Sequence, residues 1–213
     1  FTGTASNWES KVEKGRGWSY GTEMMLEKTV GKTTGWVAYT LSWTERQFEN
    51  LNYGRVYPAK YDSSHDISVA VTHEFSKKFD IGATWVYNTG NALTLGVMEY
   101  PSADIPSGTP NYSSYDEAII DYSGRNNYRM PAYHRMDVGA NFHKKKKHGI
   151  RTWSISAYNA YNQQNPFIVM WNSTGGDWRH VNGEWVEVTK SRKFLAQYSL
   201  FPIIPSISYS YKF

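Results

Sequence analysis

Strict alternation of polar and apolar residues over positions 206–213 constrains this chain more than any other feature. The segment reads Ser-Ile-Ser-Tyr-Ser-Tyr-Lys-Phe. Successive side chains of a β-strand point to opposite faces, so Ile207, Tyr209, Tyr211 and Phe213 are predicted to line one face, opposite the serines and the lysine. One face suits lipid and the other suits water. A half-buried strand of a soluble protein shows the same alternation, but usually ends on polar residues.

The same period of two recurs in seven segments, and each has one apolar, aromatic face. The segments are residues 18–27, 37–44, 67–75, 79–88, 135–143, 152–161 and 206–213. The second face favours Ser, Thr, Gly, Ala and Asn, whereas the outer faces of a soluble sandwich often carry long charged side chains. Small and polar side chains are expected on the inside of a membrane barrel. The pattern favours a transmembrane antiparallel β-barrel wall over a soluble sandwich, which stays open as an alternative.

Composition agrees with a barrel wall. Aromatic residues make up 16% of the chain, with 9 Trp and 17 Tyr, although only 40% of residues are apolar. Only every second residue of a barrel strand meets lipid, and Trp and Tyr collect at the membrane interfaces. No apolar run approaches the length of a transmembrane helix, and the start at Phe1 shows no signal-peptide pattern.

Charge and cysteine content narrow the possible partners. The chain has no cysteine, which excludes disulfides and cysteine-ligated zinc. The net charge is +4, and much of the excess comes from residues 144–148, which read Lys-Lys-Lys-Lys-His. A single run of this kind is usually a solvated turn, so we expect no nucleic-acid partner.

Connections between the seven segments alternate in length. Short turns are predicted at residues 30–34, 76–78 and 144–149, and long loops at 47–65, 90–132 and 162–205. Bacterial barrels have short periplasmic turns and long extracellular loops, which would place Phe213 at the periplasmic rim. An odd number of strands does not close a bacterial barrel, so we expect a piece of a larger one.

The last long loop contains two further apolar runs, at residues 167–171 and 193–201. Turn-rich residues separate them. We interpret the runs as a β-hairpin above the membrane, with two additional membrane strands as the alternative.

Several segments resemble successive strands of TonB-dependent outer-membrane receptors. They are Gly17–Glu23, Gly35–Ser42, Tyr61–Ser68, Trp85–Asn91, Tyr133–Val138, Tyr158–Asn162 with Asn165–Pro166, and Phe201–Phe213. Their order and spacing are more specific than any single motif. The resemblance is closest to receptors of Bacteroidota, although residues 129–138 look less like the glycan importers of that group than like their other receptor relatives.

This resemblance implies a 22-stranded barrel of the outer membrane, filled by an N-terminal plug. Residues 1–213 would be the C-terminal segment of that barrel, without plug and N-terminal strands. The expected function is active uptake of a nutrient: a glycan, a siderophore or other chelate, or a peptide. Expected partners are the rest of the barrel and its plug, the TonB complex through that plug, the outer-membrane assembly machinery, lipid and lipopolysaccharide. A surface lipoprotein is left open as a further partner. The alternatives are a plug-free porin or adhesin barrel and a soluble carbohydrate-binding β-domain.

Three groups of residues are candidate functional positions. By resemblance, Tyr209, Tyr211 and Phe213 form the signal that the assembly machinery reads. Charged residues on the polar phase are expected to contact a plug or each other across the wall, with direct contact to the ligand as the alternative. These residues are Glu23, Arg46, Glu74, Arg135 and Asp137. Loop aromatics could stack on a ligand or pack among themselves, and these include Tyr115, Trp171, Trp178 and Trp185.

No catalytic, cofactor or metal site is predicted. Asp62, His65 and Asp66 are close in sequence, but they lie where a loop re-enters the wall, and we interpret them as loop anchors rather than as metal ligands. His73 and His143 have no Ser or Cys partner visible in the sequence. We therefore expect a transporter and not an enzyme.

Overall fold

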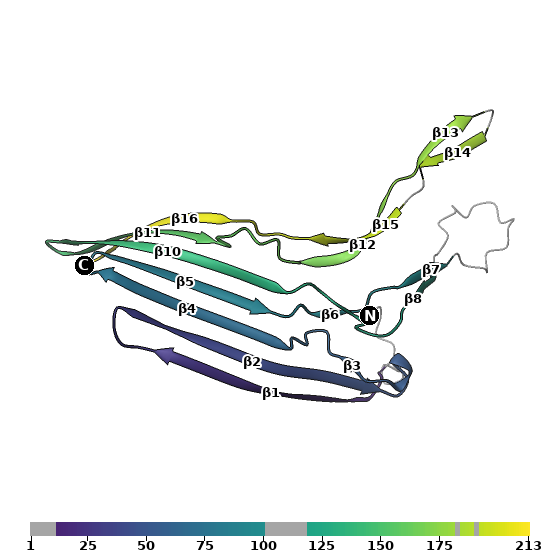
Figure 1. The fold of residues 1–213 in the computed structure, drawn as a ribbon, viewed down its shortest axis with the longest axis horizontal. Helices are drawn as coiled ribbons and strands as arrows, with labels where there is room; N and C mark the ends of the chain where they lie inside the picture. The colour runs from purple at the N-terminus through teal and green to yellow at the C-terminus, as the bar shows by residue number, and fades with distance from the viewer. Residues whose placement is uncertain (1–11, 101–118, 182–183, 190–191) are drawn as a thin grey trace, which may run out of the picture. The chain divides into compact units, whose positions relative to one another are not determined.

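The computed structural model describes residues 12–100, 119–181, 184–189 and 192–213, and β-strands dominate them. The main sheet has the strand order β1-β2-β4-β5-β10-β11-β16, with β3 paired to β2 (Figure 1). Its strands are β1 (Gly15–Lys28), β2 (Thr33–Phe48), β3 (Tyr57–Pro58), β4 (His65–Ser76), β5 (Phe79–Asn88), β10 (Tyr133–Lys146), β11 (Gly149–Tyr158) and β16 (Ile204–Lys212). The fold is all-β with antiparallel pairing, as the alternation predicts, and no sheet of the described residues is closed.

Four smaller sheets and one short 3-10 turn complete the described structure. The turn is Asn52–Gly54. The two-stranded sheets pair β6 (Ala92–Leu93) with β9 (Tyr128–Arg129), β7 (Met98–Tyr100) with β8 (Ile119–Asp121), β12 (Ile168–Thr174) with β15 (Arg192–Tyr198), and β13 (Asp177–Val181) with β14 (Glu184–Thr189). β12 pairs with β15 and neither strand joins the main sheet, so the two runs pair with each other as predicted, while a position above a membrane stays a prediction. Over the described residues, no helix has the length and apolar character needed to cross a membrane.

Each of the seven predicted segments corresponds to one long strand, but several predicted boundaries were wrong. Thr33, Thr34, Gln47 and Phe48 were predicted as turn or loop and belong to β2. The segment 152–161 ends as a strand at Tyr158, because Asn159 adopts a left-handed φ of 52° that an extended ladder cannot contain. Residues 144–146 were predicted as turn and instead continue β10, so the turn contains only Lys147 and His148.

The chain divides into two compact units. Among the described residues, the first comprises 12–22, 40–64, 90–100 and 119–130, and the second comprises 23–39, 65–89, 131–181, 184–189 and 192–213. The second unit contains β4, β5, β10, β11 and β16 side by side (Figure 1). The three short turns, at residues 29–32, 77–78 and 147–148, also belong to it.

Register within the second unit keeps polar residues opposite polar residues. Gly139 on β10 lies opposite Gly82 on β5 and opposite Ser156 on β11, and Ser156 lies opposite Ser206 on β16. The neighbouring row is apolar, with Val138 between an alanine on either side. A slip of one residue would exchange the two faces, so the alternation excludes a register shift of one residue.

Few apolar side chains of the described residues are buried. They are Tyr57, Ala59, Ala92 and Val169. The apolar face of the second unit's sheet is open instead, since Phe75, Ile155 and Ile207 are 54%, 51% and 67% exposed. This sheet is a single layer with one uncovered apolar face.

Candidate functional site

Arg135 and Asp137 are two residues apart on β10, so their side chains leave the same, polar face. The Arg135 Nε atom donates to both carboxylate oxygens of Asp137, at 3.0 and 3.1 Å. Nη2 lies 2.9 Å from Oδ2, and the two side chains are 24% and 28% exposed. A guanidinium and a carboxylate in this fork arrangement form one of the stronger ion pairs available to a protein.

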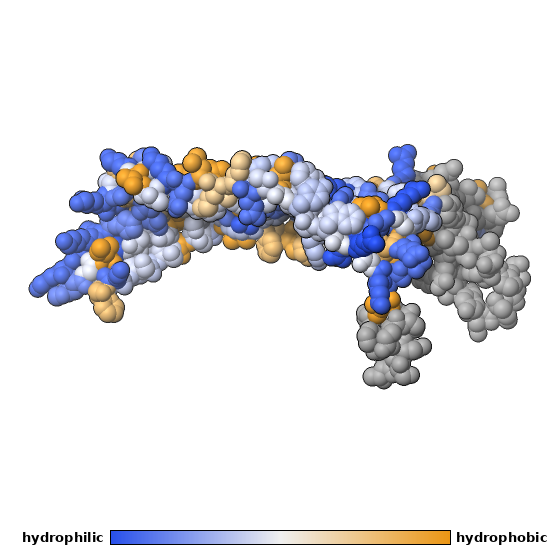
Figure 2. All heavy atoms as spheres, turned by 90° about the horizontal axis from the view of Figure 1, so that it is seen from below, coloured by the Kyte–Doolittle hydropathy of each residue, from blue (hydrophilic) through white to orange (hydrophobic). Residues whose placement is uncertain are grey.

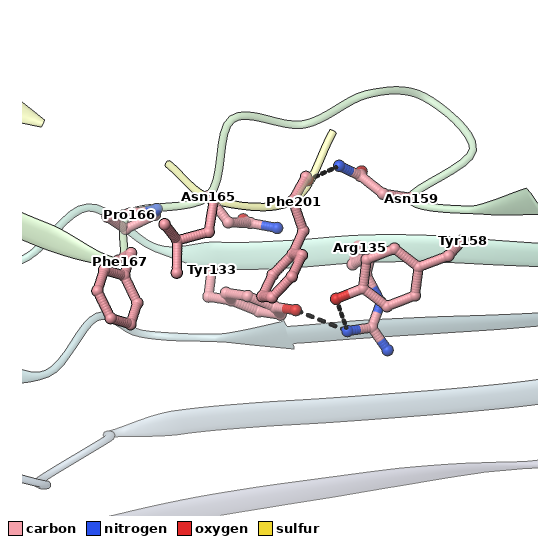
Figure 3. Close-up of a pocket in the computed structure, with 9 residues that line it drawn as sticks. Tyr133, Arg135, Tyr158, Asn159, Asn165, Pro166, Phe167 and Phe201 are labelled. Atoms are coloured by element: carbon pink, nitrogen blue, oxygen red, sulfur yellow. Dashed lines mark hydrogen bonds between the residues drawn. The ribbon is translucent and has the colours of Figure 1, made fainter. Parts of the chain in front are cut away.

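Two tyrosines complete the surroundings of the Arg135 guanidinium. Nη1 donates to the hydroxyl oxygens of Tyr133 and Tyr158, at 2.8 and 2.7 Å (Figure 3). The guanidinium carbon also lies 4.1 Å from the centre of the Tyr158 ring, a cation–π contact. We name Tyr133, Arg135, Asp137 and Tyr158 the Arg135 cluster. The charges of Arg135 and Asp137 compensate each other within the sheet.

Asn159 connects this cluster to the loop that follows β11. Its side chain is only 1% exposed. The amide nitrogen donates to the backbone oxygens of Gln163 and Phe201, each at 2.9 Å, and the amide oxygen accepts from Gln163 N at 2.9 Å. The backbone N–H of Asn159 donates to Asp137 Oδ1 at 2.9 Å. Through its backbone N–H and its buried amide, Asn159 therefore joins β10, the loop and the segment before β16.

Two further asparagines of this loop bind backbone groups in the same way. The Asn165 side chain accepts from His134 N at 2.9 Å and donates to His134 O at 2.8 Å, as a neighbouring strand would. Asn162 Oδ1 accepts from Ile203 N at 3.0 Å. Their spacing of three was visible in the sequence, but no functional role was predicted for these asparagines.

A cavity of about 200 Å³ opens beside the Arg135 cluster (Figure 3). It is lined by Tyr133, Arg135, Tyr158, Asn159, Asn165, Pro166, Phe167, Leu200 and Phe201. Pockets for drug-sized ligands usually measure about 300–1,000 Å³. Because Asp137 already compensates the Arg135 charge, the cavity suits one apolar or planar group rather than an anion.

A second polar network lies near the short turns on the same face. His143 Nε2 lies 2.6 Å from Asp80 Oδ2, and His143 Nδ1 lies 2.9 Å from Thr152 Oγ1. Asn141 donates to Asp80 Oδ1 at 2.8 Å and accepts from Ser154 Oγ at 2.6 Å. The sequence showed no hydroxyl partner for His143, since Thr152 lies on the next strand and becomes a neighbour only through the register.

Asp62 anchors loops of the first unit, in agreement with its interpretation as an anchor. Its carboxylate is 4% exposed, accepts from Thr44 N at 2.7 Å and forms an ion pair with Arg129. Arg129 Nη1 also donates to the backbone oxygens of Asp62 and Gly90, at 2.8 and 3.0 Å. Nowhere in the described ranges do three His, Cys, Asp or Glu side chains form a group suited to a metal ion.

The other predicted charged residues do not join the Arg135 cluster. Glu74 lies exposed on β4 opposite Asp80, at the short-turn end of the sheet, whereas Arg135 lies opposite Val86. Glu23 lies exposed on β1. Arg46 belongs to the first unit, where it pairs with Tyr57 of β3 through the register. Contact of these residues with a plug stays a prediction.

The predicted loop aromatics are distributed over two hairpins. Trp171 lies on β12 opposite Leu195 and is 49% exposed. Trp178 on β13 is opposite Glu187, and Trp185 on β14 is opposite His180. Tyr115 lies outside the described residues. Among these aromatics, Trp171 is described with its side chain, and it does not line the Arg135 cavity.

The predicted assembly signal lies on and directly after β16. The Tyr209 ring packs against Trp153 of β11 with centres 4.9 Å apart. The rings of Tyr211 and Phe213 are 6.4 Å apart. All three belong to the apolar phase, as the alternation predicts.

No family model, no curated protein and no solved structure matches this chain. The functional interpretation therefore depends on the sequence pattern and on the geometry of the sheet.

Proposed function

We propose that this chain forms part of the barrel wall of a TonB-dependent receptor in the outer membrane, which takes up a nutrient actively. The observation that carries this proposal is the single-layer sheet of the second unit, with one uncovered apolar face and one polar face. Apolar surface left in water is costly, at roughly 25 cal/mol for each Å². Lipid would cover it without a second protein layer.

Strand lengths in the second unit support the proposal. β4, β5, β10, β11 and β16 contain 12, 10, 14, 10 and 9 residues. A tilted transmembrane strand needs about 9–11 residues. All five strands are therefore long enough to cross a membrane, with β16 at the lower limit of the range.

The polar face supports a lumen that holds a plug or water. Small side chains such as Gly82, Gly139 and Ser156 share this face with the two hydrogen-bonded networks. A plug can pack closely against small residues. The charged pairs also lie on the polar face, which would point into the lumen and away from lipid. The substrate class stays a glycan, a siderophore or other chelate, or a peptide.

Matched lysine substitutions on β16 test the membrane part of the proposal. Ile207 and Ser208 are neighbours in the middle of the strand, on opposite phases. A lysine facing lipid at the bilayer centre costs about 2–4 kcal/mol, whereas a lysine facing the lumen costs little. Ile207→Lys should therefore reduce the amount of protein in the outer-membrane fraction, and Ser208→Lys should leave it unchanged. Equal behaviour of the two variants, with wild-type protein soluble without detergent, would favour the carbohydrate-binding domain.

Uptake measurements separate a receptor from a porin or adhesin. Cells that produce the protein are compared with and without a functional TonB complex. Accumulation of the nutrient should require that complex. Accumulation that persists after loss of the complex contradicts the receptor proposal and favours a porin.

A further inference from the structure

A row of aromatic side chains crosses the apolar face of the second unit near its short turns. The ring centres of Phe75 and Phe79 are 5.4 Å apart, and those of Phe79 and Phe142 are 4.9 Å apart. Phe142 lies opposite Trp153, whose ring centre is 4.9 Å from that of Tyr209. The row therefore reaches from β4 to β16, with Phe142 and Trp153 adjacent through the register.

Two basic residues follow this row on the same face, one step closer to the turns. Lys144 comes two residues after Phe142, and Arg151 two residues before Trp153. Lys144 and Arg151 lie directly opposite each other in the register. Like charges directly opposite across a ladder destabilise a sheet. The Arg151 Nε atom is buried and has no hydrogen-bond acceptor within the described structure.

The short turns add further positive charge at this end of the unit. The exposed lysines in these turns and at the adjoining strand ends are Lys28, Lys32, Lys77, Lys78, Lys146 and Lys147. The nearby carboxylates of Glu27, Glu74 and Asp80 alternate onto the polar face, and Asp80 is bound to His143. Figure 2 shows strongly hydrophilic residues gathered at the same end, on the left of the view. The apolar face thus ends in an aromatic row followed by cations that form no ion pair within the described part of the chain.

We infer that this edge binds the head groups of anionic glycerophospholipids, with Lys144 and Arg151 as the phosphate contacts. The inference rests on the proposed membrane location. Aromatic rings prefer the level of the head groups, and lysine or arginine side chains extend from there to the phosphates. The guanidinium fork matches a phosphate, which would also supply an acceptor for Arg151 Nε. One phosphate between Lys144 and Arg151 would relieve their repulsion.

Lipid selectivity in reconstituted vesicles tests this inference. The protein is inserted into phosphatidylcholine vesicles that contain spin-labelled phosphatidylglycerol or spin-labelled phosphatidylcholine, and the immobilised fraction of each label is measured by electron paramagnetic resonance. Wild-type protein should prefer the phosphatidylglycerol label. The double variant Lys144→Gln/Arg151→Gln should lose most of that preference. The ratio of phosphatidylglycerol to phosphatidylcholine association should fall about fivefold for each charge removed.

Lys145 and Lys212 provide a matched control. Both lie opposite Ile150, at the same level but on the polar phase. The double variant Lys145→Gln/Lys212→Gln removes the same charge and should keep the preference of wild-type protein. Equal losses in the two double variants, or no preference in wild-type protein that does insert, overturn the lipid site while leaving the membrane proposal intact. Failure of wild-type protein to insert into either kind of vesicle overturns both.

Discussion

His143 on β10 and Asp80 on β5 are joined by a hydrogen bond of 2.6 Å between Nε2 and Oδ2. The other nitrogen of the same ring lies 2.9 Å from Thr152 Oγ1 on β11. One imidazole therefore connects three neighbouring strands through side chains alone. The His143 and Asp80 side chains are 31% and 18% exposed, so water competes only partly for this pair.

Replacement of His143 by glutamine should destabilise the sheet, because Asp80 loses a short hydrogen bond in a half-buried position. We expect a loss of about 1–2 kcal/mol in the free energy of unfolding. Urea unfolding in detergent micelles, followed by circular dichroism, measures it. Lys145→Gln serves as the control, since Lys145 is an exposed neighbour on the same face of β10. Similar unfolding curves for the two variants would show that the Asp80–His143 bond contributes little.

The Arg135 cluster should depend on the shape of the guanidinium and not only on its charge. Arg135→Lys keeps one positive charge but cannot reach Asp137, Tyr133 and Tyr158 together. Arg135→Met leaves Asp137 without its cation. Because the pair is about a quarter exposed, we expect a loss of about 2 kcal/mol for the methionine variant and at least half of that for the lysine variant. If the Arg135→Lys variant is as stable as wild-type protein in urea unfolding, the forked hydrogen bonding between Arg135 and Asp137 contributes little.

The alternation predicted the strands and which residues share a face, because the period of two belongs to each strand by itself and does not depend on which strands are its neighbours. The same-face position of Arg135 and Asp137 follows from it directly. The partner of His143 does not, because residues 89–132 separate β5 from β10 and the sequence alone leaves their register open. Asn159 illustrates the same limit. Its acceptor Phe201 O lies 42 positions away in the sequence. Two strand pairs lie between them, and the alternation does not predict how these bring Phe201 back to Asn159.

Asn159 should stabilise its loop through its amide and through its tolerance of a positive φ. Asn159→Gly keeps the φ of 52° accessible but removes the bonds to Gln163 and Phe201, whereas Asn159→Ala also adds backbone strain. We expect losses of about 1–3 kcal/mol for glycine and about 1 kcal/mol more for alanine. Amide hydrogen exchange of residues 160–166 and 201–203 measures the loosening. Wild-type protection in the glycine variant would contradict a role for the amide.

The ion pair between Asp62 and Arg129 should hold the loops of the first unit in place. Arg129→Gln leaves a carboxylate that is 4% exposed without its cation, although Thr44 N still donates to it. We expect local destabilisation of about 2–4 kcal/mol. Limited proteolysis within residues 52–64 and 123–130 should become faster. Arg125→Gln is the control, because the bond that joins Arg125 to Asn52 comes from its backbone N–H. Equal cleavage of both variants would exclude a specific role for the ion pair.

If a plug contacts the polar face, charge reversal at Arg135 should loosen it more than it weakens binding of the nutrient. Arg135→Glu places a second carboxylate beside Asp137, so the cluster would repel itself and present negative charge to the plug. Single-channel recording in planar bilayers should then show more frequent open events than for wild-type protein, while the nutrient's Kd changes little. The Arg135→Lys variant keeps the sign of the charge and should show fewer open events than the Arg135→Glu variant. Retention of the plug together with lost nutrient affinity would instead make Arg135 a ligand contact.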